Sequence, residues 1–426
     1  MKTETLHQLF LESSGVSTDT RKITKDCLFF ALKGDNFNGN AFASEAIEKG
    51  AKYVVIDESV YHIPNGKTIL CENALETLQE LARFHRKFLN IPILALTGSN
   101  GKTTTKELIN AVLSEKFNTT ATSGNLNNHI GVPLTLLKMN SKTEIGVVEM
   151  GANHHNEIAK LCTIAEPDYG YITNFGKAHL EGFGSLEGVV KAKTELYRHL
   201  QANDKLVFVN ARDKRQMKLS EDIKRYTFGE KEQDCMVTLK NASKHVEVLF
   251  KGQHIHSNLI GLYNFNNVAA AIAIGDFFGI SSEAIKRAIE KYIPNNNRSQ
   301  LIEKATNKII LDAYNANPTS MLAAIENFKQ AEGNEKILIL GDMFELGSDA
   351  PLEHQHITTF LEHHPFGKAY LVGSNFKKTR HNANHIMQFE TFESLSAHLK
   401  KHPLERNFIL IKGSRGMALE RVLEIF

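Results

Sequence analysis

The chain has 426 residues, of which 42% are hydrophobic and 23% are charged, a mixture that is typical of soluble globular proteins and excludes a disordered chain. Its 50 lysines and arginines nearly balance its 48 aspartates and glutamates, and a formal net charge of +2 gives no reason to expect a nucleic-acid or membrane surface. At roughly 150 residues per domain, this length predicts about three domains.

Cysteine usage and the N-terminal segment indicate the compartment. The four cysteines lie far apart without a CxxC pair, so neither a zinc site nor a disulfide framework is predicted. The first residues lack the apolar stretch of a signal peptide, and no window approaches the roughly 18 apolar residues of a membrane span. We therefore expect a cytoplasmic protein with reduced thiols and no membrane insertion, and we expect a monomer.

Residues 1–89 form the first predicted domain. Three short apolar runs are predicted to be strands: 27–32, 53–57 and 68–72. A helix between the first two is expected to end at Gly50. A longer amphipathic helix over 73–89 stops before Pro92 and is expected to lead into the next domain.

Residues 90–296 form the second predicted domain. Near-continuous apolar runs are typical of parallel strands that are buried on both faces. Four such runs occur here: 93–97, 145–150, 169–173 and 205–209. Hairpin-like pieces follow between 226 and 260, and a helix is predicted over 264–278.

Residues 297–426 form the third predicted domain. Four strand-like runs alternate with predicted helices: 308–312, 336–342, 369–373 and 408–413. The helices are expected after Pro318, around 352–362 and over 418–426. This alternation predicts a second doubly wound unit, with ligand loops at the carboxyl ends of its strands. The predicted fold class is therefore α/β, in three domains.

The strongest chemical signal is the loop TGSNGKTTT, Thr97–Thr105, between a predicted strand and a predicted helix. Its glycines let backbone N–H groups approach phosphate oxygens, and the helix N-terminus adds partial positive charge. Lys102 is predicted to reach the β and γ phosphates of ATP, and Thr103 to bind Mg²⁺ through its hydroxyl. Leu96 stands where the common GxxxxGK[ST] pattern has its first glycine, so this P-loop is a variant. The alternative is a glycine turn with a chance lysine.

Weaker candidates follow other predicted strands of the second domain. Glu149 ends a strand beside the P-loop, where a Mg²⁺ ligand is expected because this ion prefers oxygen. Asn174, His179 and Glu181 lie in a glycine-rich loop, in which His179 could bind metal or substrate. Lys191 and Lys193 lie on a predicted helix at a spacing that points them to different sides, so only one of them would face a site. Taken alone, these residues could also be a solvated carboxylate, a surface histidine and an exposed lysine.

The third domain has candidates of its own. Arg298 lies at the predicted domain junction, from which a guanidinium could close onto phosphates. Asp312, Asp342 and Lys412 end predicted strands, and Arg415 follows the last of them. Charged groups at several strand ends favour a ligand-binding rim, although polar loops also occur without such a role.

These segments together resemble the Mur ligase family, the ATP-dependent amide-forming enzymes of peptidoglycan synthesis. The P-loop alone indicates only an ATPase, whereas GNLNNHIGVP, EMGAN, DAYNANP and GDMFELG are typical of the family branch that adds D-alanyl-D-alanine. The matching motifs run along the whole chain in the order of the family: STDTR (17–21), FFALKG (29–34), TGSNGKTTTKE (97–107), TSGNLNNHIGVPLTLL (122–137), EMGAN (149–153), ITNFGKAHLEGFGS (172–185), GLYNFNNVAAAIA (261–273), NNRSQ (296–300), DAYNANPTS (312–320), GDMFELG (341–347) and IKGSRGM (411–417).

The resemblance implies an N-terminal UDP-sugar-binding domain, a central P-loop ATPase domain and a C-terminal Rossmann-like domain. It implies a ligase that uses ATP and Mg²⁺ to join D-alanyl-D-alanine to UDP-N-acetylmuramoyl-tripeptide through an acyl phosphate. The implied ATP-binding residues are Gly98, Ser99, Asn100, Gly101, Lys102, Thr103, Thr104, Asn267 at adenine, Arg298 at the phosphates and Asp312 at the ribose. The implied UDP-substrate residues are Thr20, Arg21, Asn125, Asn127 and Asn128. The implied Mg²⁺ ligands are Thr103, Glu149, His179 and Lys193, the last as a carbamylated lysine, and the implied catalytic residues are Lys102, Glu149, His179 and Lys193.

Two positions depart from the family pattern, since Asn40 replaces the usual histidine and Asn156 the usual glycine. Another amino-acid ligase of the superfamily and a non-catalytic nucleotide-binding regulator are the alternative functions. The sequence leaves open whether the tripeptide ends in lysine or diaminopimelate. It also leaves open which residues bind D-alanyl-D-alanine, for which the loops at Asn315 and 412–415 are candidates. Arg298 and Asp312 are expected to reach ATP when the domains close.

Overall fold

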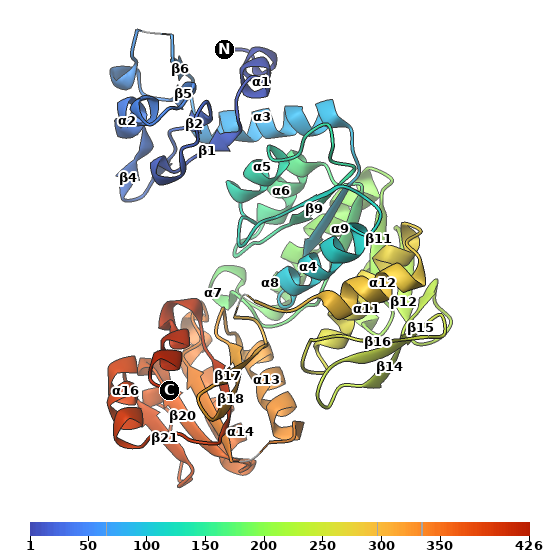
Figure 1. Ribbon diagram of the computed structural model, residues 1–426, viewed down its shortest axis with the longest axis vertical. Helices are drawn as coiled ribbons and strands as arrows, with labels where there is room; N and C mark the ends of the chain where they lie inside the picture. The colour runs from blue at the N-terminus through green and yellow to red at the C-terminus, as the bar shows by residue number, and fades with distance from the viewer. Residues whose placement is uncertain (65, 296, 334) are drawn as a thin grey trace.

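The structure, a computed structural model, describes residues 1–64, 66–295, 297–333 and 335–426. Figure 1 shows three bodies in chain order, with the N-terminal one at the top and the C-terminal one at the bottom. Each is built on a sheet of its own, covered by helices, which confirms the predicted α/β class. The predicted limit at residue 89 coincides with the end of a helix, and the limit at 296 lies outside the described residues. The domain limits therefore stay a prediction.

The N-terminal body has a four-stranded parallel sheet in the order β1-β2-β5-β6. Helix α3 begins because the Asn73 side chain accepts the N–H groups of Leu75 and Glu76, and it ends at Asn90, which has a φ of 50°. It packs against α5 and α6 of the central body, as the prediction of a connecting helix requires. The elements are α1 (Thr3–Leu11), β1 (Val16–Ser17), η1 (Thr20–Lys22), β2 (Leu28–Phe30), β3 (Lys33–Gly34), β4 (Phe37–Asn38), η2 (Gly39–Phe42), α2 (Ala43–Glu48), β5 (Tyr53–Ile56), η3 (Ser59–Tyr61), β6 (Thr68–Leu70) and α3 (Ala74–Leu89).

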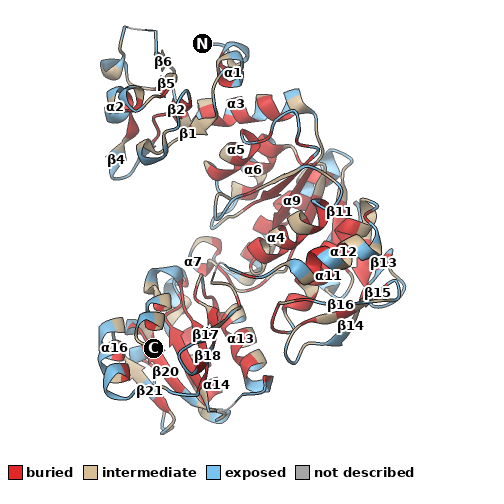
Figure 2. Ribbon diagram, viewed as in Figure 1, coloured by how far each residue is buried: buried red, intermediate tan, exposed pale blue. Residues whose placement is uncertain are grey.

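The central body has a seven-stranded parallel sheet in the order β13-β12-β11-β10-β7-β9-β8. Every residue of β7 is buried, and its side chains alternate between two cores, so that Leu94 and Leu96 pack with residues of α4 and α11 while Ala95 packs with residues of α5 and α6. Figure 2 shows that buried residues predominate in the interior of the central body. The elements are β7 (Ile93–Thr97), α4 (Lys102–Leu113), β8 (Thr119–Ala121), α5 (Gly131–Leu136), β9 (Ile145–Glu149), α6 (Glu157–Ala165), β10 (Tyr169–Ile172), α7 (Leu180–Phe183), α8 (Leu186–Lys193), α9 (Glu195–Ala202), β11 (Leu206–Asn210), α10 (Lys214–Leu219), β12 (Lys224–Gly229), β13 (Cys235–Met236), β14 (Thr238–Asn241), β15 (Glu247–Phe250), β16 (Gln253–His256), α11 (Asn264–Phe277) and α12 (Ser282–Lys291). The last three strands form the small antiparallel sheet that the hairpin-like pieces predicted.

The C-terminal body has a six-stranded sheet in the order β17-β18-β22-β19-β20-β21, parallel except for the edge strand β17. Helix α13 starts in a capping box at Asn317 with Pro318 in its first turn, as predicted. The elements are β17 (Gln300–Lys304), β18 (Asn307–Asp312), α13 (Pro318–Gln330), β19 (Lys336–Gly341), η4 (Gly347–Asp349), α14 (Ala350–His363), β20 (Lys368–Val372), α15 (Ser374–Lys377), β21 (Ile386–Phe389), α16 (Phe392–Lys401), β22 (Phe408–Lys412), η5 (Arg415–Met417) and η6 (Leu419–Glu424).

The C-terminal segment differs from its prediction. The sequence predicts a helix over 418–426, whereas the structure has the 3₁₀ helices η5 and η6 there, separated by Ala418 with a φ of 47°. The buried residues Leu419 and Val422 are three apart, and side chains at this spacing stack on one side of a 3₁₀ helix. Burial of this pair against the sheet explains the tighter turn. No helix among the described residues is long and apolar enough to cross a membrane.

A buried histidine pair joins the N-terminal body to the central one. His7 Nε2 lies 3.0 Å from His85 Nδ1, and His85 Nε2 lies 2.9 Å from the Met139 carbonyl oxygen. Because a carbonyl only accepts, His85 must carry its proton on Nε2 and accept one from His7. Burial, reinforced by the neighbouring His85, lowers the pKa of His7 to about 4.

We expect this pair to make the protein acid-sensitive. An unfolded histidine takes up a proton near pH 6.5, whereas folded His7 resists protonation down to about pH 4, so stability is full above pH 6.5 and is lost as pH falls through this window. By pH 4.5, about two units below the unfolded pKa, the loss should reach roughly 2–3 kcal/mol, at about 1.4 kcal/mol per unit. Urea unfolding between pH 4.5 and 7.5 should show a flatter profile for His7→Gln. The exposed-histidine control His254→Gln should keep the wild-type slope, and an equal slope in His7→Gln would contradict the assignment.

Candidate active site

A cleft of about 1090 Å³ lies at the carboxyl ends of the central strands and is closed on one side by the C-terminal body. It brings together residues that are predicted from distant motifs, which is what a composite site requires. The predicted site residues that line it are Ser99, Asn100, Gly101, Lys102, Thr103, Thr104, Asn125, Asn127, Asn128, Glu149, His179, Asn267, Arg298 and Asp312. Those that do not line it are Thr20, Arg21, Gly98 and Lys193.

The P-loop has the strand–loop–helix form that the sequence predicts. Gly98 has a φ of 140°, and a Cβ there would lie 2.0 Å from the Thr173 hydroxyl, so only glycine fits. Gly101 has a φ of 78°, and a Cβ there would lie 2.7 Å from the Asn267 Oδ1 atom. The loop is braced by Asn174, whose Oδ1 accepts from the Asn100 N–H at 3.1 Å. Close backbone approach thus fixes the shape of the loop before any ligand binds.

Lys102 is the first residue of α4, and its ammonium lies over its own loop. Its Nζ donates to the Gly98 carbonyl at 2.7 Å. Burial lowers the pKa of Lys102, and the charge of Arg298 acts in the same direction, while Glu149 and Glu345 oppose it. Two cations and two carboxylates therefore act on one another inside the cleft.

Glu149 ends β9 and is only 1% exposed. Its Oε1 accepts from Asn127 Nδ2 at 2.8 Å, and its backbone N–H donates to the Thr122 hydroxyl at 2.9 Å. Its Oε2 is buried without a hydrogen-bond partner among the described residues. Glu149 and the buried Thr103 both line the cleft, and a carboxylate oxygen without a partner in such a lining suits a hard cation.

His179 meets a residue that the sequence analysis did not single out. It has a φ of 52°, and its Nδ1 lies 2.5 Å from Glu345 Oε2 of the C-terminal body, at ion-pair distance but without hydrogen-bond alignment. Contact with His179 lowers the pKa of Glu345 against the effect of burial. The GDMFELG motif contains Glu345 and could have marked it as a candidate site residue. Only the fold shows that Glu345 contacts His179.

The C-terminal body contributes the other wall of the cleft. Arg298 stacks on the Tyr314 ring, with its guanidinium carbon 3.9 Å from the ring centroid. The Asp312 carboxylate accepts from the buried Lys412 ammonium at 2.6 Å. Asn317 Nδ2 donates to the side-chain oxygen of Asn100 in the P-loop at 2.7 Å, which ties the two bodies together.

Asp342 does not belong to this wall, although its strand-end position suggested a ligand-binding rim. It is 2% exposed and does not line the cleft. Its carboxylate accepts the N–H groups of Asn375 and Phe376, both at 2.9 Å. Asp342 therefore holds the start of α15.

Comparison with known proteins identifies the chain. Three family profiles match successive stretches: "Mur ligase family, catalytic domain" at 12–86, "Mur ligase middle domain" at 96–275 and "Mur ligase, glutamate ligase domain" at 297–415. The UDP-N-acetylmuramoyl-tripeptide–D-alanyl-D-alanine ligase of Bacillus subtilis (strain 168) is 35% identical in an alignment of 426 positions that covers 96% of this chain and 92% of that protein. The chain belongs to the Mur ligase family. The enzyme of the same name from Escherichia coli (strain K12) is 33% identical, and the alignment covers 96% of this Mur ligase and 92% of that protein.

Solved structures agree with this assignment. A crystal structure of MurF from Acinetobacter baumannii matches with a TM-score of 0.86 at 29% identity, covering 98% of this Mur ligase and 97% of that chain. The MurF ligase of Thermotoga maritima in complex with ADP matches with a TM-score of 0.84 at 26% identity, covering 100% of this Mur ligase and 98% of that chain. The predictions of family, of a three-domain α/β fold and of an ATP-dependent ligase are confirmed.

Lys193 lies just behind the cleft of this Mur ligase, at the end of α8. It is 1% exposed, its Nζ donates to the Ala152 carbonyl at 3.1 Å and it lies 5.0 Å from the centroid of the Phe183 ring. Burial lowers the pKa of Lys193 to about 7, and the charge of Lys102 contributes to the shift. The amine is therefore substantially neutral near neutral pH, which an attack on carbon dioxide requires.

The UDP-sugar side is only partly assembled in this structure. The three predicted asparagines lie in the loop before α5 and line the cleft: Asn125, Asn127 and Asn128. Thr20 and Arg21 lie instead in η1 of the N-terminal body, away from the cleft lining, where the exposed Arg21 pairs with Asp19 at 2.9 Å. The two groups of predicted UDP-substrate residues are thus separate here.

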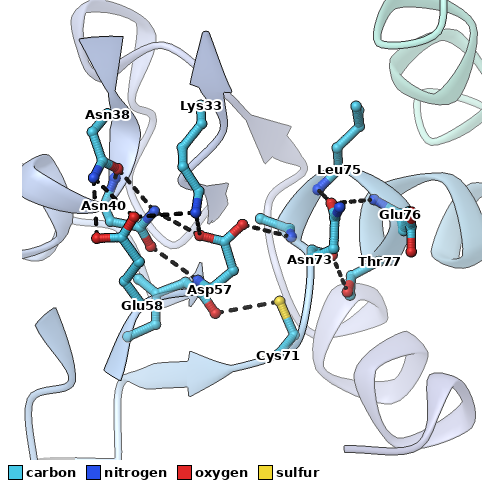
Figure 3. Close-up of polar contacts among 12 residues, drawn as sticks. Lys33, Asn38, Asn40, Asp57, Glu58, Cys71, Asn73, Leu75, Glu76 and Thr77 are labelled. Carbon is cyan, nitrogen blue, oxygen red and sulfur yellow. Dashed lines mark hydrogen bonds and ion pairs between the residues drawn. The ribbon is translucent and has the colours of Figure 1, made fainter. Parts of the chain in front are cut away.

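The two departures from the family pattern have structural explanations. Asn40 is fully buried, and Figure 3 shows its amide between Asn38 and Asp57: Nδ2 donates to Asp57 Oδ1 at 2.8 Å, and Oδ1 accepts the Asp57 N–H at 2.9 Å. Both ends of this amide are engaged within the protein, so Asn40 holds the β3–β4 hairpin rather than a ligand. Asn156 has a φ of 68°, a conformation that asparagine tolerates better than other non-glycine residues. The usual glycine is therefore dispensable there.

Proposed function

We propose that this Mur ligase acts as a cytoplasmic monomer that joins D-alanyl-D-alanine to UDP-N-acetylmuramoyl-tripeptide, completing the cytoplasmic peptidoglycan precursor. The free tripeptide carboxylate attacks the γ phosphate of ATP, which gives an acyl phosphate and ADP. The dipeptide amine then attacks the acyl carbon, and phosphate leaves from the tetrahedral intermediate. The observation that carries this proposal is the single cleft in which the P-loop, the asparagine loop and the C-terminal wall meet.

The residues act mainly by placing charge. Two anions meet in the first step, so Lys102 would neutralise the phosphates and Arg298 would approach them from the opposite wall. Asn267, whose Nδ2 donates to Asn264 at 2.7 Å, would contact adenine, and Asp312 the ribose. The backbone N–H groups of Gly101, Lys102 and Thr103, at the start of α4, would cradle the phosphate oxygens.

The donor set around Glu149 fits Mg²⁺, because it offers a buried, unpartnered carboxylate oxygen and the Thr103 hydroxyl. The residues that would hold Mg²⁺ ions are Thr103, Glu149, His179 and Lys193 as its carbamate. When bound, Mg²⁺ would supply positive charge at the transferred phosphoryl group. His179 would exchange its contact with Glu345 for this role.

The acceptor amine is the property that tests the function. Phosphate release should require ATP, a UDP-tripeptide and D-alanyl-D-alanine together, and should exceed release with lysine or diaminopimelate as amine by about 100-fold or more. Running the assay with UDP-tripeptides that end in lysine or in diaminopimelate would identify the third residue. Equal ADP release with and without both acceptor substrates would exclude a ligase of this kind. Preference for a single amino acid would favour another ligase of the superfamily, and binding without turnover a regulator.

A further inference from the structure

Lys106 is a buried cation for which the reaction described above has no use. It lies on α4 one turn beyond Lys102 and is 1% exposed, although lysine is almost never fully buried unless it is paired. Its Nζ donates to the Thr122 carbonyl at 2.6 Å and to Glu107 Oε1 at 2.5 Å. It does not line the cleft, so it touches no substrate there.

Thr122 connects this lysine to Glu149. It follows β8, is 1% exposed, and its hydroxyl accepts the Glu149 backbone N–H at 2.9 Å. Its own N–H donates to the Val147 carbonyl at 3.0 Å, which keeps it beside β9. A displacement of Thr122 therefore moves the backbone that carries the Glu149 carboxylate.

The segment that starts at Thr122 also encloses Glu149 from a second side. Asn127 Nδ2 donates to the Glu149 carboxylate at 2.8 Å, and the Asn127 carbonyl accepts the Gly151 N–H at 2.8 Å. Asn128 then accepts the Gly131 N–H at 2.9 Å at the start of α5. Residues 122–128, called here the asparagine segment, thus surround the carboxylate, and Lys106 holds the first residue of the segment against α4.

We propose that Lys106 is a positioning residue that keeps the P-loop helix in register with Glu149 and the asparagine segment. The hydrogen bond from Lys106 to Thr122 joins α4, which would hold the ATP phosphates, to the asparagine segment, which would hold the second substrate. Through Thr122 it also reaches Glu149 at the end of β9, which would hold the cation. The γ phosphate and the attacking carboxylate must come together to within about 3–3.5 Å, and a misplacement of about 1 Å can lower the rate by 10²-fold. The inference rests on the proposed function in that Glu149 must serve the ATP site.

The test is Lys106→Met in the full-length protein, since methionine keeps an unbranched apolar stem but has no donor. We expect kcat to fall by about 10- to 100-fold and the Mg²⁺ concentration for half-maximal activity to rise by about tenfold. Affinity for a fluorescent mant-ADP should stay within threefold, because Lys102 and the loop N–H groups remain. A lysine with only a structural role would change the melting temperature and leave kcat and the Mg²⁺ dependence of the folded protein unaltered.

Two further variants complete the experiment. Lys138→Met is the matched control, because the exposed Lys138 reaches Ser123 of the same segment at 3.4 Å and has no link to α4; it should match wild type within twofold. Thr122→Val removes the acceptor for the Glu149 N–H and keeps the carbonyl, so it should reproduce the kinetic pattern even if Lys106→Met does not fold. Wild-type kcat and Mg²⁺ dependence in either variant, or a loss of mant-ADP affinity equal to the loss of kcat, would overturn the proposal. All rates are measured with the amine that the wild-type protein accepts. If the proposed function is wrong, wild type itself will not use D-alanyl-D-alanine, and this result is distinct from any effect of the Lys106 variant.

Discussion

Replacement of Lys102 by alanine is expected to lower kcat by about 10³-fold, because Lys102 is the only cationic residue of the loop Thr97–Thr105 and we propose that its ammonium neutralises the transferred phosphate. Its Nζ now donates to the Gly98 carbonyl at 2.7 Å, so it has to leave that contact to reach a nucleotide. Burial and the charge of Arg298 lower the pKa of Lys102 although Glu149 and Glu345 oppose them, so further negative charge nearby would stabilise its charged form. The phosphates of ATP supply that charge.

The measurement is phosphate release at saturating substrates, together with calorimetric affinity for ATP and for the UDP-tripeptide. ATP affinity should weaken, whereas UDP-tripeptide affinity should not change, because the asparagine segment is held by Glu149 and Lys106. Lys116→Ala is the matched control, since Lys116 follows the same helix but donates to the Phe278 carbonyl at 2.9 Å, outside the cleft. Turnover by Lys102→Ala within tenfold of wild type would contradict the role.

The parts of the site that the sequence predicts well are those that local backbone geometry decides. Gly98 and Gly101 sit at positive φ between a buried strand and a helix, which is why the pattern around Lys102 identifies a phosphate loop. Glu149 could be placed because parallel strands bring their carboxyl ends to one edge of the sheet. The helical spacing of Lys191 and Lys193 likewise predicts different environments, and the structure has the first exposed and the second buried.

The parts that the sequence does not predict depend on contacts between distant segments. Glu345 meets His179 across 166 positions of chain, and nothing in either motif indicates the other partner. The sequence predicted Asp312 and Lys412 as separate charges on a ligand-binding rim. In the structure the two side chains form an ion pair with each other at 2.6 Å. The predicted roles of Thr20 and Arg21 are not tested by the fold, because η1 lies away from the cleft lining. The catalytic roles of the site residues stay predictions, and the role of Lys193 is the one that an experiment can test most directly.

Replacement of Lys193 by alanine is expected to lower kcat by about 10²- to 10³-fold if the lysine acts as a carbamate that holds Mg²⁺. A carbamate forms when a neutral amine attacks carbon dioxide, so that an N–C bond forms and a proton leaves the nitrogen. The pKa of about 7 for Lys193 provides the neutral amine, and its burial excludes competing water. In the unmodified state its Nζ donates to the Ala152 carbonyl at 3.1 Å, and Ala152 itself lines the cleft, so the added carboxylate would extend toward it.

Activity alone would not separate this role from packing, because Lys193 also lies over the Phe183 ring. Two observations do so. Wild type incubated with ¹³C-bicarbonate should give a carbamate carbon resonance that Lys193→Ala lacks, and acetate or another short carboxylate should partly restore the turnover of Lys193→Ala but not that of Lys102→Ala. Lys191→Ala, two residues earlier on α8 and exposed, should behave as wild type. Full activity in Lys193→Ala would contradict the proposed role of the carbamate. The rest of the mechanism would stand, because the charge of Lys102 and the Glu149 carboxylate do not depend on Lys193. A carbamate resonance that Lys193→Ala loses, without carboxylate rescue, would show the modification but would favour a packing role for Lys193 over a role as a Mg²⁺ ligand.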